Sequence, residues 1–157
     1  MKLKATQFIS ILLFALVMGV FWGTWFSLSR TMETVSPPTF LEIGKQFIAN
    51  LAWPMRILMP LTLVSTLPVL YFLPRSSVAF YFILIALVLM SIALVITVAI
   101  EVPIDNMIKV WTVETLPSNW MLLRERWEYY HVIRTFISIG AFGFLLSGAL
   151  ASPAKSN

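Results

Sequence analysis

The stretch VAFYFILIALVLMSIALVITVAIEV, residues 78–102, decides the fold of this chain. Glu101 is the only charged residue in it. A helix needs about 20 apolar residues to cross a hydrocarbon core of about 30 Å, and this stretch is longer. Its continuous apolar character therefore predicts a transmembrane helix.

The residues before this stretch predict an antiparallel partner helix. Pro74-Arg75-Ser76-Ser77 is a tight turn signal, and an apolar run of about residues 55–73 precedes it. Pro60 and Pro68 interrupt that run, which membrane helices tolerate when neighbouring groups satisfy the freed carbonyls. Because the turn is short, the two helices are expected to lie side by side.

Two further apolar runs, about residues 8–28 and about residues 132–150, complete a set of four. Lys2 and Lys4 precede the first run, but it is too long for the apolar region of a signal peptide, and no small-residue cleavage site follows it. It is therefore expected to stay in the protein. The last run is expected to continue a more polar helix that begins near Ser118.

The connection between the first two runs contains an amphipathic segment, residues 39–49. It follows the helix-start signal Ser36-Pro37-Pro38. The sequence therefore predicts an all-α membrane four-helix bundle, with an amphipathic segment in the first loop and a polar helix extension before the fourth span. We expect one integral membrane domain over residues 1–157.

Composition supports a membrane protein and excludes several classes of site. Hydrophobic residues make up 59% of the chain and charged residues 11%, whereas soluble domains are about 25% charged. There is no cysteine and only one histidine, His131. Thiolate sites, disulfides, haem-type and multi-histidine metal sites are therefore excluded. The net charge of +4 is spread without a basic run, which favours lipid headgroups over nucleic acid as the partner.

Charge around the spans gives conflicting indications of orientation. An even number of spans puts both termini on one side, with Lys2, Lys4, Arg75 and Lys155. The opposite side holds the other seven Lys and Arg residues. The positive-inside rule counts Lys and Arg, so the count alone would place the termini outside the cytoplasm. The first helix often dominates orientation. We therefore expect a bacterial inner-membrane protein with cytoplasmic termini.

Small residues indicate where helices touch. Gly19, Gly23 and Ser27 are spaced by four residues in the first run, and glycines also occur at 140, 143 and 148 in the last. Such patterns allow close backbone approach in lipid. We expect close helix packing on the first helix in particular. Association of the chain into a homo-oligomer is a further possibility.

A polar stripe runs along the start of the fourth span. Drawn as one helix, residues 124–138 place seven side chains within an arc of about 120°. Ionisable groups at this depth cost several kcal/mol unless they pair or face a cavity. The stripe therefore predicts a pocket facing the other helices, and its members are Arg124, Trp127, Glu128, His131, Arg134, Thr135 and Ser138.

A second polar group gathers where the third span ends. Pro103 is expected to break or bend the helix there, beside Glu101, Asp105 and Asn106. Connectivity puts these residues at the same membrane side as the polar stripe. A metal site is a weak alternative, because a di-iron bundle needs two Glu-x-x-His motifs and the chain has one histidine. We assign no metal.

The same residues resemble a known family. The C-terminal signature of the anthrone-oxygenase-like proteins, which are small four-helix integral membrane proteins, is similar to residues 102–106, Trp111, Leu116-Pro117, Trp120, Arg124, Trp127, His131 and Arg134. Residues 38–41 and Arg56-x-x-Met59-Pro60 also resemble it. The resemblance covers most of the chain and is more specific in its C-terminal part. The family favours amides near the proline, where this chain has acids.

The resemblance implies cofactor-free oxidation of an anthrone or quinol-like aromatic by molecular oxygen. His131 is then expected to act as the base, with Arg134, Arg124 and Asn106 stabilising an enolate oxygen. Trp111 and Trp127 would stack on the substrate rings. Glu128 would orient Arg124 or His131, and Glu101 would complete the binding site.

A different class of function stays open beside catalysis. The polar face would equally suit a non-catalytic lipid-binding or accessory membrane subunit. An enzyme needs His131 and consumes oxygen with an aromatic substrate, whereas a binding module tolerates His131→Gln. A transporter is disfavoured, because no inverted repeat is evident.

Overall fold

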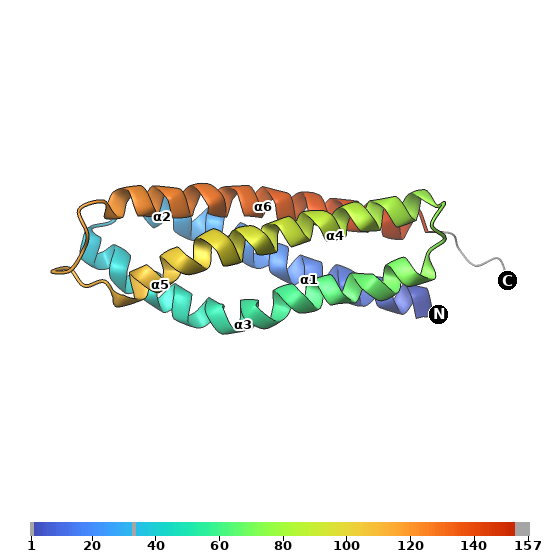
Figure 1. Ribbon diagram of the computed structural model, residues 1–157, viewed down its shortest axis with the longest axis horizontal. Coiled ribbons are helices and arrows are strands. Elements are labelled where there is room, and N and C mark those ends of the chain that lie inside the picture. The colour runs from blue at the N-terminus through green and yellow to red at the C-terminus, as the bar shows by residue number, and fades with distance from the viewer. Residues whose placement is uncertain (1, 33, 153–157) are drawn as a thin grey trace.

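Apolar side chains form four long helical segments in the computed structural model, which describes residues 2–32 and 34–152 (Figure 1). The first segment joins α1 (Lys2–Gly23), the π-helical turn η1 (Thr24–Ser29) and α2 (Arg30–Met32). The second is α3 (Pro37–Phe72). The third joins α4 (Val78–Ile96), the π-helical turn η2 (Thr97–Glu101) and α5 (Val102–Val110), and the fourth is α6 (Trp120–Leu150).

Each of the four segments is long and apolar enough to cross a membrane. This confirms the expected all-α, four-span architecture of an integral membrane protein. The segments have 31 to 36 residues, or about 46–54 Å at 1.5 Å per residue. They therefore extend beyond a hydrocarbon core of about 30 Å.

Helix α3 joins two pieces that the sequence suggested were separate. The amphipathic segment, residues 39–49, is continuous with the second span. Pro37 starts the helix where its missing N–H costs nothing. Pro54, Pro60 and Pro68 lie inside the helix, and the ribbon curves along its length (Figure 1), as expected where prolines remove backbone hydrogen bonds.

One end of the bundle contains the turn between α3 and α4 and a contact between the two described chain ends. Ser77 caps α4 by accepting a hydrogen bond from the Phe80 N–H at 3.2 Å, so α3 and α4 form the expected antiparallel pair (Figure 1). Gln7 Nε2 donates to Ser152 Oγ at 2.6 Å, which places both described chain ends at this end of the bundle. Lys155 lies outside the described residues.

The glycine that allows close helix packing lies on α6 and not on α1. A Cβ added at Gly148 would lie 2.6 Å from Ile83 Cδ1 and 3.1 Å from the Ala79 carbonyl oxygen. At Gly19 and Gly23 an added Cβ would meet nothing within 4 Å. The expectation of close packing along α1 is therefore wrong within this chain, because these glycines face outwards.

Pro103 widens the third span without breaking it. Proline has no N–H and its ring displaces the carbonyl four residues earlier. The chain responds with η2, in which the Val102 N–H donates to the Thr97 carbonyl, five residues back. Such π-helical turns are frequent at functional sites, and this one lies against the polar stripe of α6.

Two apolar clusters pack on either side of that level. One fills the half of the bundle near the termini and includes Phe14, Phe21, Ile83, Met90 and Leu145. The other fills the opposite end, where Met32, Phe40, Ile108 and Trp111 are buried. The polar residues of η2 and α6 lie between the two clusters.

Candidate functional site

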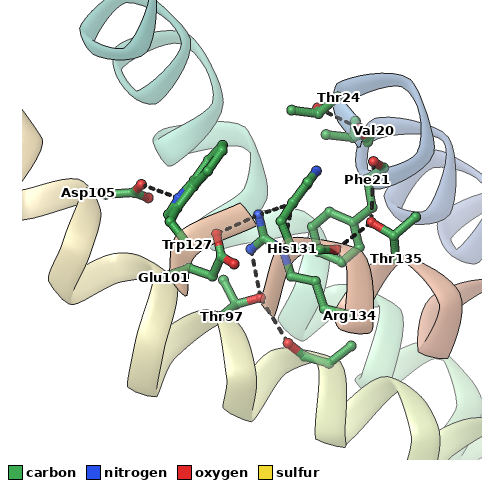
Figure 2. A network of polar contacts seen from close by, with 11 residues as sticks. Val20, Phe21, Thr24, Thr97, Glu101, Asp105, Trp127, His131, Arg134 and Thr135 are labelled. Carbon is green, nitrogen blue, oxygen red and sulfur yellow. Dashed lines mark hydrogen bonds and ion pairs between the residues drawn. The ribbon is translucent and has the colours of Figure 1, made fainter. Parts of the chain in front are cut away.

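Three polar side chains from the third span face α6. Thr97, Glu101 and Asp105 are spaced by four residues, which places them on one side of the helix. Each contacts a residue of the α6 stripe, as Figure 2 shows. Glu101 is 1% exposed. A carboxylate at this depth needs a partner, and α6 supplies one.

Arg134 is the hub of the buried polar cluster (Figure 2). Its Nη2 lies 3.1 Å from Glu101 Oε2, and its Nη1 donates to Thr97 Oγ1 at 3.1 Å. Its Nε and Nη2 lie 3.1 and 2.8 Å from His131 Nδ1. The guanidinium also lies over the Phe21 ring, 4.5 Å from its centroid. Arg134 therefore links α1, η2 and α6 through one side chain.

His131 is wholly buried and contacts two aromatic rings. The Trp127 indole stacks on the imidazole, with 5.4 Å between centroids and 7° between planes. Phe21 meets the imidazole edge to face at 6.3 Å. The His131 carbonyl accepts a hydrogen bond from Thr135 Oγ1 at 2.7 Å. These contacts fix the direction in which each ring nitrogen points.

The contact with Arg134 determines the tautomer of His131. A guanidinium has only donors, so His131 Nδ1 must accept and cannot carry a hydrogen. In the neutral ring the hydrogen is then on Nε2, which points away from Arg134 (Figure 2). Nε2 is buried and makes no hydrogen bond of good geometry within the described residues, and the Phe21 backbone is its polar neighbour. In this arrangement the Nε2–H of His131 is a donor, and the expectation that His131 acts as a base stays a prediction.

A cavity of about 510 Å³ lies between the four segments at the level of His131. Its walls are mainly apolar side chains of α1, η1, α3 and the third span. Trp127, His131 and Arg134 line it from α6, and Asp105 and Asn106 line it from α5. The cavity therefore combines an apolar chamber with a small polar group, as ligand sites do.

Asp105 is the carboxylate that reaches the cavity. Its Oδ1 accepts a hydrogen bond from Trp127 Nε1 at 3.0 Å, and its second oxygen accepts none from the described residues. Asn106 lies nearer the surface, and its Oδ1 accepts from Lys109 Nζ at 3.1 Å. The sequence drew attention to Asp105 but did not include it among the site residues.

Four of the predicted site residues do not line the cavity. Trp111 packs into the apolar cluster at the loop end and does not line this cavity, so its stacking on a substrate stays a prediction. Arg124 lies 3.7 Å from Glu128 and 3.4 Å from the Met32 carbonyl, and so it ties α6 to α2. Glu101 lies behind Arg134 and contacts that residue instead.

Thr97 and Phe21 are site residues that sequence reasoning missed. The spacing by four residues from Thr97 to Glu101 and Asp105 was a usable signal for Thr97. Phe21 carried none, since it is one apolar residue in an apolar run. Across residues 2–32 and 34–152, no three His, Asp or Glu side chains gather as a metal site would require.

Comparison with known proteins gives one match. The family model described as anthrone oxygenase matches residues 49–144. The matched residues include Asp105, Asn106, Trp127, His131 and Arg134, which are among the polar residues that line the cavity. No curated protein and no solved structure matches the chain.

Proposed function

Because the chain belongs to the anthrone oxygenase family, we propose that it oxidises a flat, hydroxylated polycyclic aromatic compound with molecular oxygen, without a cofactor. One observation carries the proposal: His131 and Asp105 line the same mainly apolar cavity between the spans. A hydrogen-bond donor and a proton acceptor beside one mainly apolar cavity suit proton abstraction next to a carbonyl.

The size and walls of the cavity support a ligand with several rings. Its volume of about 510 Å³ lies within the range of about 300–1,000 Å³ of small-molecule sites. Phe47, Met55 and Met59 line the cavity from α3. Methionine adapts to irregular shapes and packs well on aromatic faces. These walls favour a flat apolar molecule over a sugar or nucleotide.

The proposed reaction begins with proton transfer to Asp105. An anthrone has a methylene flanked by aromatic rings, and loss of one proton leaves an electron-rich enolate. The His131 Nε2–H is proposed to donate to the developing oxyanion and so to stabilise it. The enolate then reacts with oxygen. One oxygen atom becomes the new carbonyl, and the other leaves as water with the two methylene hydrogens, giving the quinone.

The cavity reaches the outer surface between α3 and the third span. Val98 and Val102 line it and are 59% and 39% exposed, and Phe47 is 37% exposed. All three are apolar and face the side where lipid surrounds the bundle. We therefore propose that the substrate arrives from the membrane and not from water.

The proposed setting is the inner membrane of a bacterium, with both termini in the cytoplasm. Lys2 and Lys4 begin the first span, and basic residues beside the first helix favour the cytoplasmic side. Membrane lipids are then the direct neighbours of the bundle. The outward-facing Gly19 and Gly23 leave room for a second copy of the chain.

The test is oxygen uptake by the detergent-purified protein given a simple anthrone, with a chelator present. Replacing His131 by leucine removes the hydrogen-bond donor, and the leucine side chain fills the buried position with apolar atoms. We expect kcat to fall by about 10²–10³, the usual cost of losing one oxyanion donor. Tyr129→Leu, at an exposed position on α6, is the matched control and should keep wild-type uptake.

Background uptake by the wild-type protein, with no quinone formed, would contradict the proposal. Such a protein that also co-purified with lipid in the cavity would be a lipid-binding subunit. Equal uptake by the wild-type protein and His131→Leu would leave oxidation in place but remove His131 from it.

A further inference from the structure

We infer that Glu101 and Thr97 are positioning residues: they hold the Arg134 guanidinium against His131 Nδ1 and so keep the ring hydrogen on Nε2, the nitrogen that points away from Arg134. The inference rests on the proposed function, in which that hydrogen is donated to the substrate oxygen. It adds a role for two residues that do not themselves act on the substrate.

The first step is that a buried guanidinium needs hydrogen-bond acceptors and a negative charge nearby. Arg134 is 9% exposed, and its N–H groups and its charge must be satisfied inside the bundle. Thr97 Oγ1 accepts from Nη1 at 3.1 Å, and Glu101 supplies the opposite charge at 3.1 Å from Nη2. These two contacts fix one side of the guanidinium plane, and its remaining edge meets His131.

The second step is that Arg134 is the polar partner of Glu101. Glu101 does not line the cavity, and neither of its oxygens accepts a hydrogen bond within the described part of the chain. Its ion pair with Arg134 is its polar contact. A carboxylate buried to 1% exposure is costly, so its use lies in what it does to Arg134.

The third step is the geometry of η2. Thr97 begins this π-helical turn and Glu101 ends it. Because the turn is wider than an α-helical turn, both side chains lie beside α6 at the level of one guanidinium (Figure 2). The Phe21 ring, 4.5 Å away from the guanidinium carbon, closes the other face. Arg134 is thus oriented from two neighbouring elements.

The fourth step is the arrangement that Glu101 prevents. Asp105 is the other carboxylate of this region, and it already accepts the Trp127 N–H. Without the Glu101 charge, Arg134 would turn towards Asp105. Its N–H groups would then leave His131 Nδ1, and the ring hydrogen would no longer be confined to Nε2. The Nε2 donor would be lost for part of the time.

The experiment is ¹⁵N NMR of the detergent-purified protein labelled in histidine. His131 is the only histidine in the sequence, so one ring gives the whole spectrum. In the wild-type protein at neutral pH we expect two well-separated ring resonances, with the directly bonded hydrogen on Nε2. In Glu101→Gln we expect the two resonances to move together, because the hydrogen exchanges between both nitrogens.

Thr97→Val provides a second variant that keeps the side-chain volume and removes one acceptor. We expect the same change to a smaller extent, which covers the case in which Glu101→Gln fails to fold. Glu125→Gln, an exposed carboxylate on α6, is the control and should give the wild-type spectrum.

A hydrogen on Nδ1 in the wild-type protein would overturn the inference, as would a wild-type spectrum from both Glu101→Gln and Thr97→Val. The spectrum does not depend on turnover. An inactive protein with the expected tautomer would therefore contradict the proposed function alone, and an active protein with the other tautomer would contradict this inference alone.

Discussion

Replacement of Asp105 by asparagine is expected to lower kcat for anthrone oxidation by about 10²–10⁴, the usual contribution of a general base. In the wild-type protein Trp127 Nε1 donates to Asp105 Oδ1 at 3.0 Å. The asparagine oxygen can still accept this hydrogen bond, so the indole is expected to stay stacked on His131. The amide cannot take up a proton. Oxygen uptake and quinone absorbance measure the effect.

Glu125→Gln is the matched control for this change, because Glu125 is exposed and does not line the cavity. It should keep wild-type kcat. An Asp105→Asn variant as active as the control would show that the proton goes elsewhere. Asp105 would then be a residue that only holds Trp127.

Replacement of Arg134 by methionine is expected to lower the free energy of unfolding by about 3–5 kcal/mol. Methionine fills similar space but leaves Glu101 buried without the positive charge that now lies 3.1 Å away. Arg126→Met is the control on the same helix. Arg126 is exposed and contacts the Tyr130 ring at 6.0 Å, so its loss should cost little. Denaturant unfolding in detergent measures both.

The double variant Glu101→Leu with Arg134→Met tests the reason for that loss. Apolar replacement of both partners of a buried ion pair is often neutral or stabilising. We therefore expect the double variant to regain most of the lost stability while remaining inactive. A single Arg134→Met variant as stable as Arg126→Met would contradict the burial argument.

The sequence predicted the spans because lipid imposes a simple rule on length and apolarity. The length and apolarity of residues 78–102 predicted a spanning helix. The short turn at residues 74–77 predicted that the preceding helix lies antiparallel beside it. Helical periodicity also put His131 and Arg134 on one inward face, which the structure shows to be buried. These features depend on local pattern alone.

Other features depend on contacts between distant residues. The role of His131 depends on which of its nitrogens meets Arg134, and one-dimensional spacing does not contain that information. Trp111 lies close to the signature residues in sequence, yet it packs in an apolar cluster at the loop end. Gly148 meets Ile83 across two helices, whereas the more regular glycine pattern of α1 faces outwards.

The most direct test of the central claim, that this cavity oxygenates an aromatic substrate, is the mass of the quinone formed from an anthrone under ¹⁸O₂. We predict that the product made by the wild-type protein carries one labelled oxygen atom, at a rate well above the protein-free blank and abolished by Asp105→Asn. Quinone formed without label, or only at the blank rate, would contradict the claim.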